Sequence, residues 1–443
     1  METDRLQRSL ATTATEAVAL ARRLGVEQAE AGASYDEGLS VTVRLGELES
    51  VQRQRDRGLA VTVYASGRKG SASTTDIAPK AVEETVRKAV SIASFTAEDE
   101  FAGLANAELM AKASPDLDLY HSWNMDVESA QTLALRAENA ARGFHRRIKN
   151  SEGATVSTGG GVRVYANSHG FCGGYPTSSH SVSCSVVAQN EDYLERDYWF
   201  TVGRAPEALE APEAVGEEAA RRALRRLGGR QLSTRRVPVI FPAELAAGLF
   251  GHLIAAISGS SQYRRASFLL DAQGERIFPE FVEIEEDPLI PQAMGSAAFD
   301  GEGVATALSP LVEKGVLKRY VLSSYSARRL GMTTTANAGG IHNLVVRPTT
   351  GALESLLVQS PQAFMVGELL GQGINTVTGD YSRGAAGFWV EGGEITYPVN
   401  EVTIAGNLRD LFIGIVAIGA DVDLRGRVRC GSVLIDGLTV AGR

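Results

Sequence analysis

Apolar residues near the N-terminus recur with a helical period. An apolar residue occurs at every third or fourth position in the series Leu6, Leu10, Ala14, Ala17, Ala21 and Leu24. This spacing predicts an amphipathic helix, and Gly25 stands where its C-terminal cap belongs. Between residues 29 and 73 apolar and polar residues alternate instead, which predicts antiparallel strands with one solvated face. A second helix is expected over residues 79–94.

A similar order of elements follows a loop-like stretch. Residues 96–125 contain the turn signal Ser114-Pro115-Asp116, so we place a domain boundary near residue 110. A helix is expected from Val127 to Gly143, followed by β-like runs over residues 154–200. Four apolar residues at strict four-residue spacing then predict another helix: Val215, Ala219, Ala223 and Leu227. Helix, sheet and helix thus occur twice, although no sequence period indicates a repeat.

The pattern changes after Gly228-Gly229. Residues 237–241 form an apolar run typical of a buried strand, and a helix is expected over residues 242–258. Many short strands with glycine turns follow, which favours a closed or strongly curved sheet. We therefore predict an α+β fold, in which N-terminal helix-and-antiparallel-sheet domains precede a β-rich, barrel-like C-terminal domain. The predicted domains are residues 1–110 (α/β), 111–229 (central α/β) and 232–443 (β-rich).

Composition and charge narrow the class of protein. Hydrophobic residues make up 44% and charged residues 22%, as in soluble globular proteins. The net charge of −9 argues against nucleic acid as a partner, and the basic run of residues 221–226 is interpreted as a solvated helix face. Three cysteines cannot form a disulfide framework. With neither a signal-peptide pattern nor a long apolar stretch, we expect a cytoplasmic protein that does not bind membranes.

The strong catalytic motifs are missing. The chain contains no His-Glu-x-x-His, Gly-x-Ser-x-Gly, Walker A or Gly-x-Gly-x-x-Gly motif, and none of its six histidines is followed by an acid. A self-sufficient zinc protease needs two imidazoles on one helix face and a carboxylate that deprotonates the bound water. The chain does not supply them in that form.

Two weaker patterns have simpler interpretations. His169 with Cys172 and His180 with Cys184 have zinc-like spacings, but on a strand the second pair would lie about 13 Å apart. We interpret the four residues as buried thiols and surface histidines. The triplet of residues 159–161, all glycine, resembles a phosphate cradle, but no helix start or lysine follows it, so a tight turn is favoured.

Long blocks in the C-terminal half carry a family resemblance. They stand in a fixed order: Phe299-Asp300-Gly301-Glu302-Gly303-Val304, Leu311-Val312-Glu313-Lys314-Gly315-Val316-Leu317, Tyr325-Ser326-Ala327-Arg328-Arg329-Leu330-Gly331, Thr333-Thr334-Thr335-Ala336-Asn337-Ala338, Thr378-Gly379-Asp380-Tyr381-Ser382-Arg383-Gly384-Ala385 and Tyr397-Pro398-Val399-Asn400-Glu401-Val402. Together with Tyr165-Ala166-Asn167-Ser168-His169-Gly170, this series resembles the TldD/PmbA family over essentially the whole chain. The form of the block from Asp380 to Ala385 resembles the PmbA (TldE) branch.

The resemblance also has consequences for zinc. In the TldD branch a helix carries His-Glu-x-x-x-His, and a cysteine near the C-terminus completes the zinc site. The matching helix here places Ala247 at the first histidine, Gly248 at the glutamate and His252 at the second histidine, and Cys430 matches the cysteine. The resemblance therefore implies degenerate metal positions, no catalytic residue and no cofactor in this chain, with zinc expected in a TldD-type partner.

The block around Asp380, Tyr381, Ser382 and Arg383 leaves two interpretations open. Its glycines suggest a turn with unusual φ, across which Asp380 and Arg383 could pair. In one interpretation the segment lines a cleft for an extended peptide, and in the other it shapes the sheet and a subunit interface.

The functional hypothesis follows from the resemblance. We expect the partner subunit of a heteromeric TldD/TldE zinc metalloprotease that cleaves unfolded peptides and peptide-antibiotic precursors. The alternative is a homodimeric, non-catalytic peptide-binding or scaffold protein. A self-sufficient metalloprotease with displaced ligands is a third hypothesis.

Overall fold

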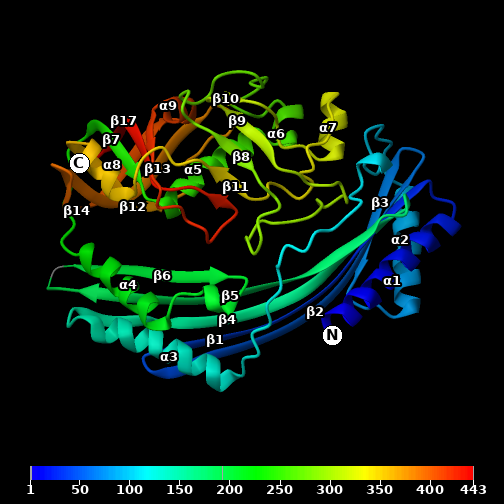
Figure 1. The fold of residues 1–443 in the computed structure, drawn as a ribbon, viewed down its shortest axis with the longest axis horizontal. Coiled ribbons are helices and arrows are strands. Elements are labelled where there is room, and N and C mark those ends of the chain that lie inside the picture. The colour runs from blue at the N-terminus through cyan, green and yellow to red at the C-terminus, as the bar shows by residue number, and fades with distance from the viewer. Residues whose placement is uncertain (1, 192, 443) are drawn as a thin grey trace.

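A computed structural model describes residues 2–191 and 193–442 of the chain. Residues 1 and 443, at the outer ends of the first and third predicted domains, lie outside the described residues. The fold has two layers, a long curved sheet covered by helices and a β-rich C-terminal layer (Figure 1).

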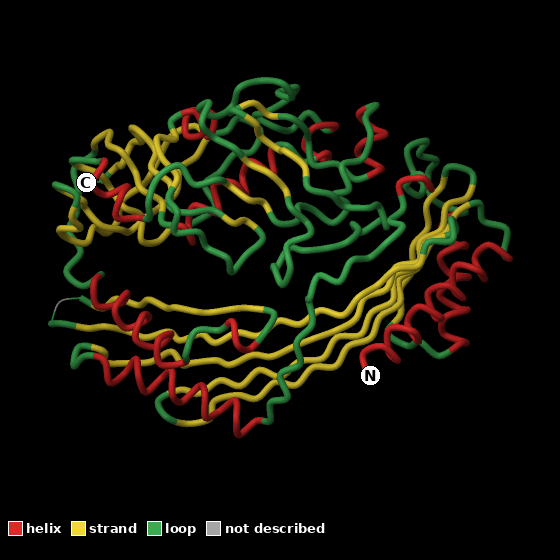
Figure 2. The backbone as a smooth tube through the Cα atoms, viewed as in Figure 1, coloured by secondary structure: helices red, strands yellow, loops and turns green. Residues whose placement is uncertain are grey.

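The first layer is one six-stranded antiparallel sheet in the order β3-β2-β1-β4-β5-β6. Its strands are β1 (Gln28–Arg44), β2 (Glu47–Ala65), β3 (Arg68–Thr74), β4 (Ile148–Asn167), β5 (Cys172–Gln189) and β6 (Leu194–Gly203). β1 and β4 join the two halves along a continuous register from Glu30 opposite Asn167 to Val43 opposite Ala154. Strands from both predicted N-terminal segments therefore share a single sheet, visible as an uninterrupted band in Figure 2.

Four helices cover one face of this sheet: α1 (Glu2–Arg23), α2 (Pro79–Ala93), α3 (Val127–Phe144) and α4 (Pro212–Arg225). α1 and α2 pack on apolar residues at one end of the strands, such as Val61 and Val164, and α3 and α4 pack on Val41 and Val156 further along. These helices match the predicted ones. Gly25 has φ +90 just after α1, as its capping role requires.

The opposite face of the sheet faces the C-terminal layer (Figure 1). Ser40 and Ser157 form a cross-strand hydrogen bond of 2.9 Å, and Thr42 and Thr155 form another of the same length. Alternation along β1 and β4 thus separates a helix-covered apolar face from a second face that carries hydroxyl side chains in this part of the sheet.

The turn predicted at residues 159–161 is wrong, because these glycines lie in the middle of β4. A Cβ on Gly160 would lie 3.0 Å from Cε2 of Tyr120, and one on Gly161 would lie 2.4 Å from Oδ1 of Asp36. Glycine inside a strand marks such close approaches as well as turns, and local sequence does not distinguish the two.

The C-terminal layer contains the closed sheet that the glycine-rich pattern predicted. Its strands are β7 (Arg235–Phe241), β12 (Gln362–Leu370), β13 (Asp380–Glu391), β14 (Glu394–Asn407) and β17 (Val433–Ala441). They follow the order β14-β13-β12-β7-β17, and pairing of β14 with β17 closes the barrel. β15 (Ile415–Ile418) extends the sheet beside β17. The predicted α+β class is confirmed.

Smaller elements complete this layer. A second sheet has the order β10-β9-β8-β11-β16, with β8 (Ile284–Glu286), β9 (Ser309–Glu313), β10 (Val316–Leu317), β11 (Leu344–Val346) and β16 (Val428–Arg429). Its helices are α5 (Ala243–Ala256), α6 (Gly259–Tyr263), α7 (Ser324–Leu330), α8 (Leu353–Gln359) and α9 (Leu408–Ile413). No helix within the described residues is long and apolar enough to cross a membrane.

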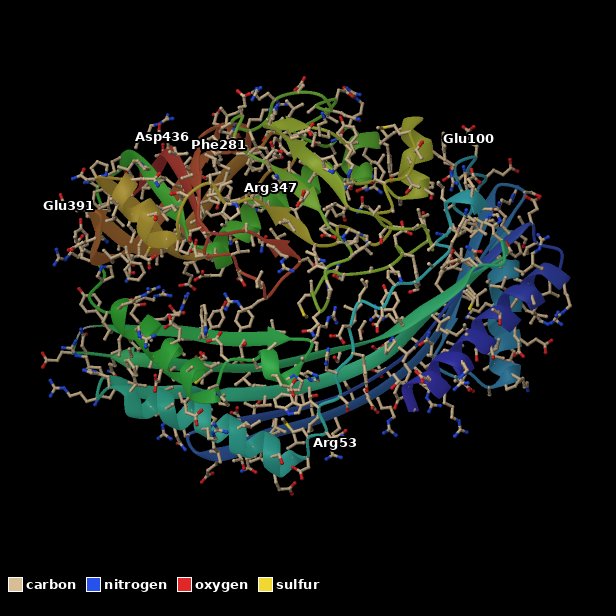
Figure 3. All side chains as sticks on the ribbon, viewed as in Figure 1. Arg53, Glu100, Phe281, Arg347, Glu391 and Asp436 are labelled. Atoms are coloured by element: carbon tan, nitrogen blue, oxygen red, sulfur yellow. The ribbon has the colours of Figure 1, made fainter. Side chains whose placement is uncertain are left out.

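The two layers are joined at both ends of the curved sheet. At one end the guanidinium of Arg328 on α7 donates to the carbonyl oxygens of Phe101, Gly103 and Leu104 at 2.7–2.9 Å. At the other end α4 and β6 meet the barrel through buried ion pairs described below. Side chains from both layers extend into the space between these ends (Figure 3).

Candidate functional site

Helix α5 carries the positions that match the zinc-binding helix. Leu249, Phe250 and Leu253 are buried in the barrel core, which fixes the helix against the sheet. Gly248 and Gly251 lie on its exposed side, and a Cβ at either position would contact nothing outside the helix backbone. The face that would present a catalytic glutamate is therefore bare.

His252 packs against the barrel strand β13. Its ring meets the ring of Tyr381 edge to face, with centroids 6.1 Å apart. Burial, and secondarily the positive charge of Arg383, lower the pKa of His252 below its ordinary value. Tyr381 is 2% exposed, and burial raises its pKa to about 12. His252 is therefore a neutral imidazole beside the neutral phenol of Tyr381. Such a pair can pack and form hydrogen bonds, but neither group readily releases a proton.

Arg383 carries the positive charge of this site. Its Nη2 donates to the carbonyl oxygen of Leu369 at 3.4 Å, whereas its Nε is buried and has no hydrogen-bond partner among the described residues. The hydroxyl of Tyr381 is likewise buried. Because an unsatisfied buried donor costs about 1–3 kcal/mol, this cluster has hydrogen-bonding capacity that the chain itself does not use.

The predicted turn from Asp380 to Arg383 is wrong, since these residues begin β13. Gly379, with φ +83, provides the turn just before the strand. Within the described residues Asp380 and Arg383 form no ion pair, because Asp380 instead accepts hydrogen bonds from Thr378 at 2.6 Å and Asn407 at 3.5 Å. Residues 380 and 383 differ by three positions, so on a strand their side chains point to opposite faces.

Cys430 contacts the first turn of α5. Its Sγ is 3.9 Å from the carbonyl oxygen of Ala243, whereas His252 lies in the third turn of the helix and packs against Tyr381. Burial, reinforced by the charges of Asp423 and Asp421, raises the pKa of the Cys430 thiol. A protonated thiol, a single imidazole and the methyl group of Ala247 do not fit the ligand set of a zinc site.

The second histidine and cysteine pattern does not form a metal site either. His180 and Cys184 lie on β5, and the His180 ring is engaged by the Thr158 hydroxyl and the His121 carbonyl, each at 2.8 Å. Within the described residues no group of three or more His, Cys, Asp or Glu side chains could hold a metal. His180 is only 2% exposed, so its interpretation as a surface histidine is wrong. Its strand face is covered by the segment that contains Trp123.

The roles of the buried arginines in and just after α4 were missed by sequence reasoning. Arg222 pairs with Asp197 on β6 at 3.3 Å and with Glu244 on α5 at 2.8 Å. Arg226 pairs with Asp197 at 3.5 Å and with Glu368 on β12 at 2.5 Å. The run was interpreted as a solvated face, but part of it is a buried junction between the layers. The partners lie far away in the chain, so no local signal could have revealed them.

Family models match almost the whole chain. The descriptions are PmbA/TldA metallopeptidase domain 1 over residues 29–93, the central domain over residues 120–227, and the C-terminal domain over residues 234–442. The chain belongs to the PmbA/TldD metallopeptidase family.

Within this family the chain is similar to proteins of the PmbA branch. It is 47% identical to metalloprotease PmbA of Escherichia coli O157:H7, over 94% of this chain and 92% of the relative. It is 46% identical to the metalloprotease PmbA homolog of Haemophilus influenzae, over 96% of this chain and 94% of the relative.

Solved structures share the fold. A putative modulator of DNA gyrase from Bacteroides thetaiotaomicron is 27% identical, with a TM-score of 0.93 and coverage of 98% of both chains. TldE from Thermococcus kodakarensis, at 19% identity, has a TM-score of 0.83 over 97% of this chain and 99% of that one, a likeness of fold alone.

Proposed function

We propose that this chain is the non-catalytic partner subunit of a cytoplasmic TldD/TldE-type zinc metallopeptidase that cleaves unfolded peptides. In this proposal the TldD-type subunit holds the zinc, and this chain contributes a surface on which the peptide lies. Membership of the family supports peptide hydrolysis as the reaction. The residues at the degenerate metal positions support a division in which the partner holds the zinc and this chain does not.

The observation that carries the proposal is the donor set on α5. Metal-assisted peptide hydrolysis requires a metal held by several ligands and a base that accepts a proton from the bound water. Here a methyl group and a hydrogen stand at positions 247 and 248, and the remaining candidates are the ring of His252, which packs against Tyr381, and the thiol of Cys430, which contacts the first turn of the helix.

The peptide-binding part of the proposal rests on unused polar groups. Arg383 presents a buried Nε without a partner among the described residues, beside the buried hydroxyl of Tyr381 and the ring of His252. The polar face of the curved sheet offers hydroxyl groups, and its edge strands β3 and β6 have backbone groups to which an extended peptide could add. Such backbone recognition suits unfolded substrates because it requires little sequence preference.

The test combines metal analysis with reconstitution. The chain is purified alone and after co-expression with a TldD-type protein, its zinc content is measured, and cleavage of an unstructured peptide is followed with each chain alone and with both. We expect substoichiometric zinc and no chelator-sensitive cleavage from this chain alone. We expect a stable heteromer whose cleavage requires both chains.

Two results would overturn the proposal. Stoichiometric zinc with chelator-sensitive cleavage by the isolated chain would make it a self-sufficient peptidase. A stable homodimer that never associates with the TldD-type protein would favour the scaffold alternative.

A further inference from the structure

A cavity of about 460 Å³ lies between the polar face of the curved sheet and the C-terminal layer. Its floor includes Arg163 on β4 and Tyr175 on β5, which are opposite each other in the strand register. Its remaining walls come from residues 294–301 and 338–342 and from Arg427. We call it the arginine cavity. It is distinct from the α5 site, because none of the residues that line it is on α5 or β13.

Three guanidinium groups line the arginine cavity: those of Arg163, Arg204 and Arg427. Within the described part of the chain none of them is ion-paired with a carboxylate, although the protein as a whole carries a net charge of −9. Guanidinium groups without a carboxylate partner in a concave site are the usual way in which proteins bind oxyanions.

Arg204 is held in place by both layers. Its Nη1 donates to the carbonyl oxygen of Ser178 on β5 at 2.8 Å, and its Nη2 donates to that of Met294 at 3.0 Å. Its Nε is buried and has no partner among the described residues. Burial, together with the positive charge of Arg427, lowers the pKa of Arg204. An anion in the cavity would relieve the uncompensated charge.

Asp300, the one acidic side chain among the described residues that line the cavity, does not neutralise these arginines. Oδ1 of Asp300 accepts hydrogen bonds from the backbone N–H groups of Glu302 and Val304 at 2.9 and 3.0 Å. Its Oδ2 accepts one from the N–H of Ala338 at 2.9 Å. The carboxylate is thus used to fix the loops of the cavity wall.

A fixed histidine adds a polar group to the wall. His342 is 8% exposed, and both its Nδ1 and its backbone N–H donate to Oε1 of Glu286, at 2.8 and 2.7 Å. Burial acts to raise the pKa of Glu286, but the hydrogen bond from His342 and the charge of Arg319 hold it below its ordinary value. The carboxylate therefore orients the imidazole, leaving Nε2 as the ring nitrogen that is available to a ligand.

An aromatic surface adjoins the cationic groups. Tyr165, Tyr175 and Phe299 line the same cavity, and the rings of Tyr175 and Phe299 meet edge to face with centroids 5.5 Å apart. A ligand that contacts both the arginines and the aromatic rings of the cavity must carry an anionic group next to an apolar one. The last residue of a peptide combines an α-carboxylate with a side chain in this way.

We propose that the arginine cavity binds the C-terminal residue of a peptide, with its α-carboxylate at Arg163, Arg204 and Arg427 and an apolar side chain against Tyr175 and Phe299. The choice of a peptide over other oxyanions rests on the proposed function. The cavity would anchor the end of a substrate or of a cleavage product on the non-catalytic subunit.

Binding to the isolated full-length chain tests the proposal without the protease reaction. Fluorescence anisotropy compares a labelled, unstructured hexapeptide ending in phenylalanine with the same peptide carrying a C-terminal amide. A third peptide has a C-terminal amide and one internal glutamate. R163A/R427A removes two charges from the cavity, and both side chains are exposed, so the fold should tolerate the change. The matched control is R53A/R57A, which removes two exposed charges elsewhere on the sheet; Figure 3 labels Arg53 on the outer side.

We expect the free carboxylate to bind at least about tenfold more tightly than the amide, as charge-assisted hydrogen bonds allow. R163A/R427A should abolish this preference, and R53A/R57A should retain it. Equal binding of the free and amidated peptides, or a preference unchanged in R163A/R427A, would overturn the proposal. Binding that follows the internal glutamate instead would overturn the assignment to a peptide terminus. A failure to form a heteromer would count against the proposed function and leave these results intact.

Discussion

The ring of His252 meets the ring of Tyr381 edge to face at a centroid distance of 6.1 Å, which joins helix α5 to barrel strand β13. Tyr381 comes from a sequence block that carried the family resemblance, and His252 lies on the helix matched to the zinc-binding helix. Arg383 is two residues beyond Tyr381 on the same strand face. In this chain the helix that matches the zinc-binding helix therefore ends in an aromatic and cationic cluster. That cluster offers polar groups for a ligand without offering a base to activate water.

Substitution of Arg383 tests whether this cluster contacts substrate. R383A should lower kcat/KM for peptide cleavage by the heteromer about tenfold or more, because one charge-assisted hydrogen bond contributes about 1.5–3 kcal/mol. Heteromer affinity, measured by light scattering or calorimetry, should change much less. S382A is the matched control, since Ser382 is exposed on the neighbouring position of the strand. Equal losses of cleavage and assembly in R383A would favour the purely structural interpretation.

The environment of His252 makes stability depend on pH. Its pKa is lowered in the folded protein, so the unfolded chain binds a proton first as the pH falls through about 6.5. The contribution of His252 to stability is therefore fully present above that pH and is lost as the pH falls. Urea midpoints at about pH 7.5 and 5.5 should differ less for H252Q than for the wild type. Identical differences in the two proteins would show that His252 is not the titrating group.

The buried junction between the layers should stabilise the protein strongly. Arg222 is 8% exposed and pairs with Asp197 and Glu244, so R222A leaves Glu244 without its cation and Asp197 with Arg226 alone, at 3.5 Å. We expect a loss of roughly 3–5 kcal/mol in the free energy of unfolding, measured in urea. The adjacent Arg221 is exposed and pairs with Glu218 on the same helix, so R221A should stay within about 0.5 kcal/mol of wild type. Similar effects of both substitutions would contradict the buried junction.

Thiol reactivity should separate the three cysteines. Cys172 is exposed, whereas Cys184 and Cys430 are buried. Burial raises the pKa of all three thiols, that of Cys184 to about 12, so accessibility to the reagent is what distinguishes Cys172. A disulfide reagent should therefore label one thiol per native chain rapidly, and C172S should lack this phase. Rapid labelling of Cys430 in the native protein would contradict its placement beneath α5.

Much of the local structure could be predicted from the sequence. The end of α1 near Gly25 and the start of α3 at Val127 are predictable, because apolar periodicity, capping residues and glycine are local signals. The same signals failed at Gly160, where glycine allows Tyr120 to approach a strand, and at Asp380, where a strand begins directly after a turn. In both places the deciding contact comes from another segment.

The sequence alone determined the class of fold, the family blocks and the substitution of alanine and glycine at two positions of the zinc helix, because each depends on residues close together in the chain. The tertiary structure was needed to show that the N-terminal strands form one sheet, that Cys430 contacts the first turn of α5 whereas His252 packs against β13, and that three arginines share a cavity with His342, which Glu286 orients. These features could not be predicted from local sequence, because burial and distance set the charge of an ionisable group. Both depend on neighbours as far as hundreds of residues away in the chain.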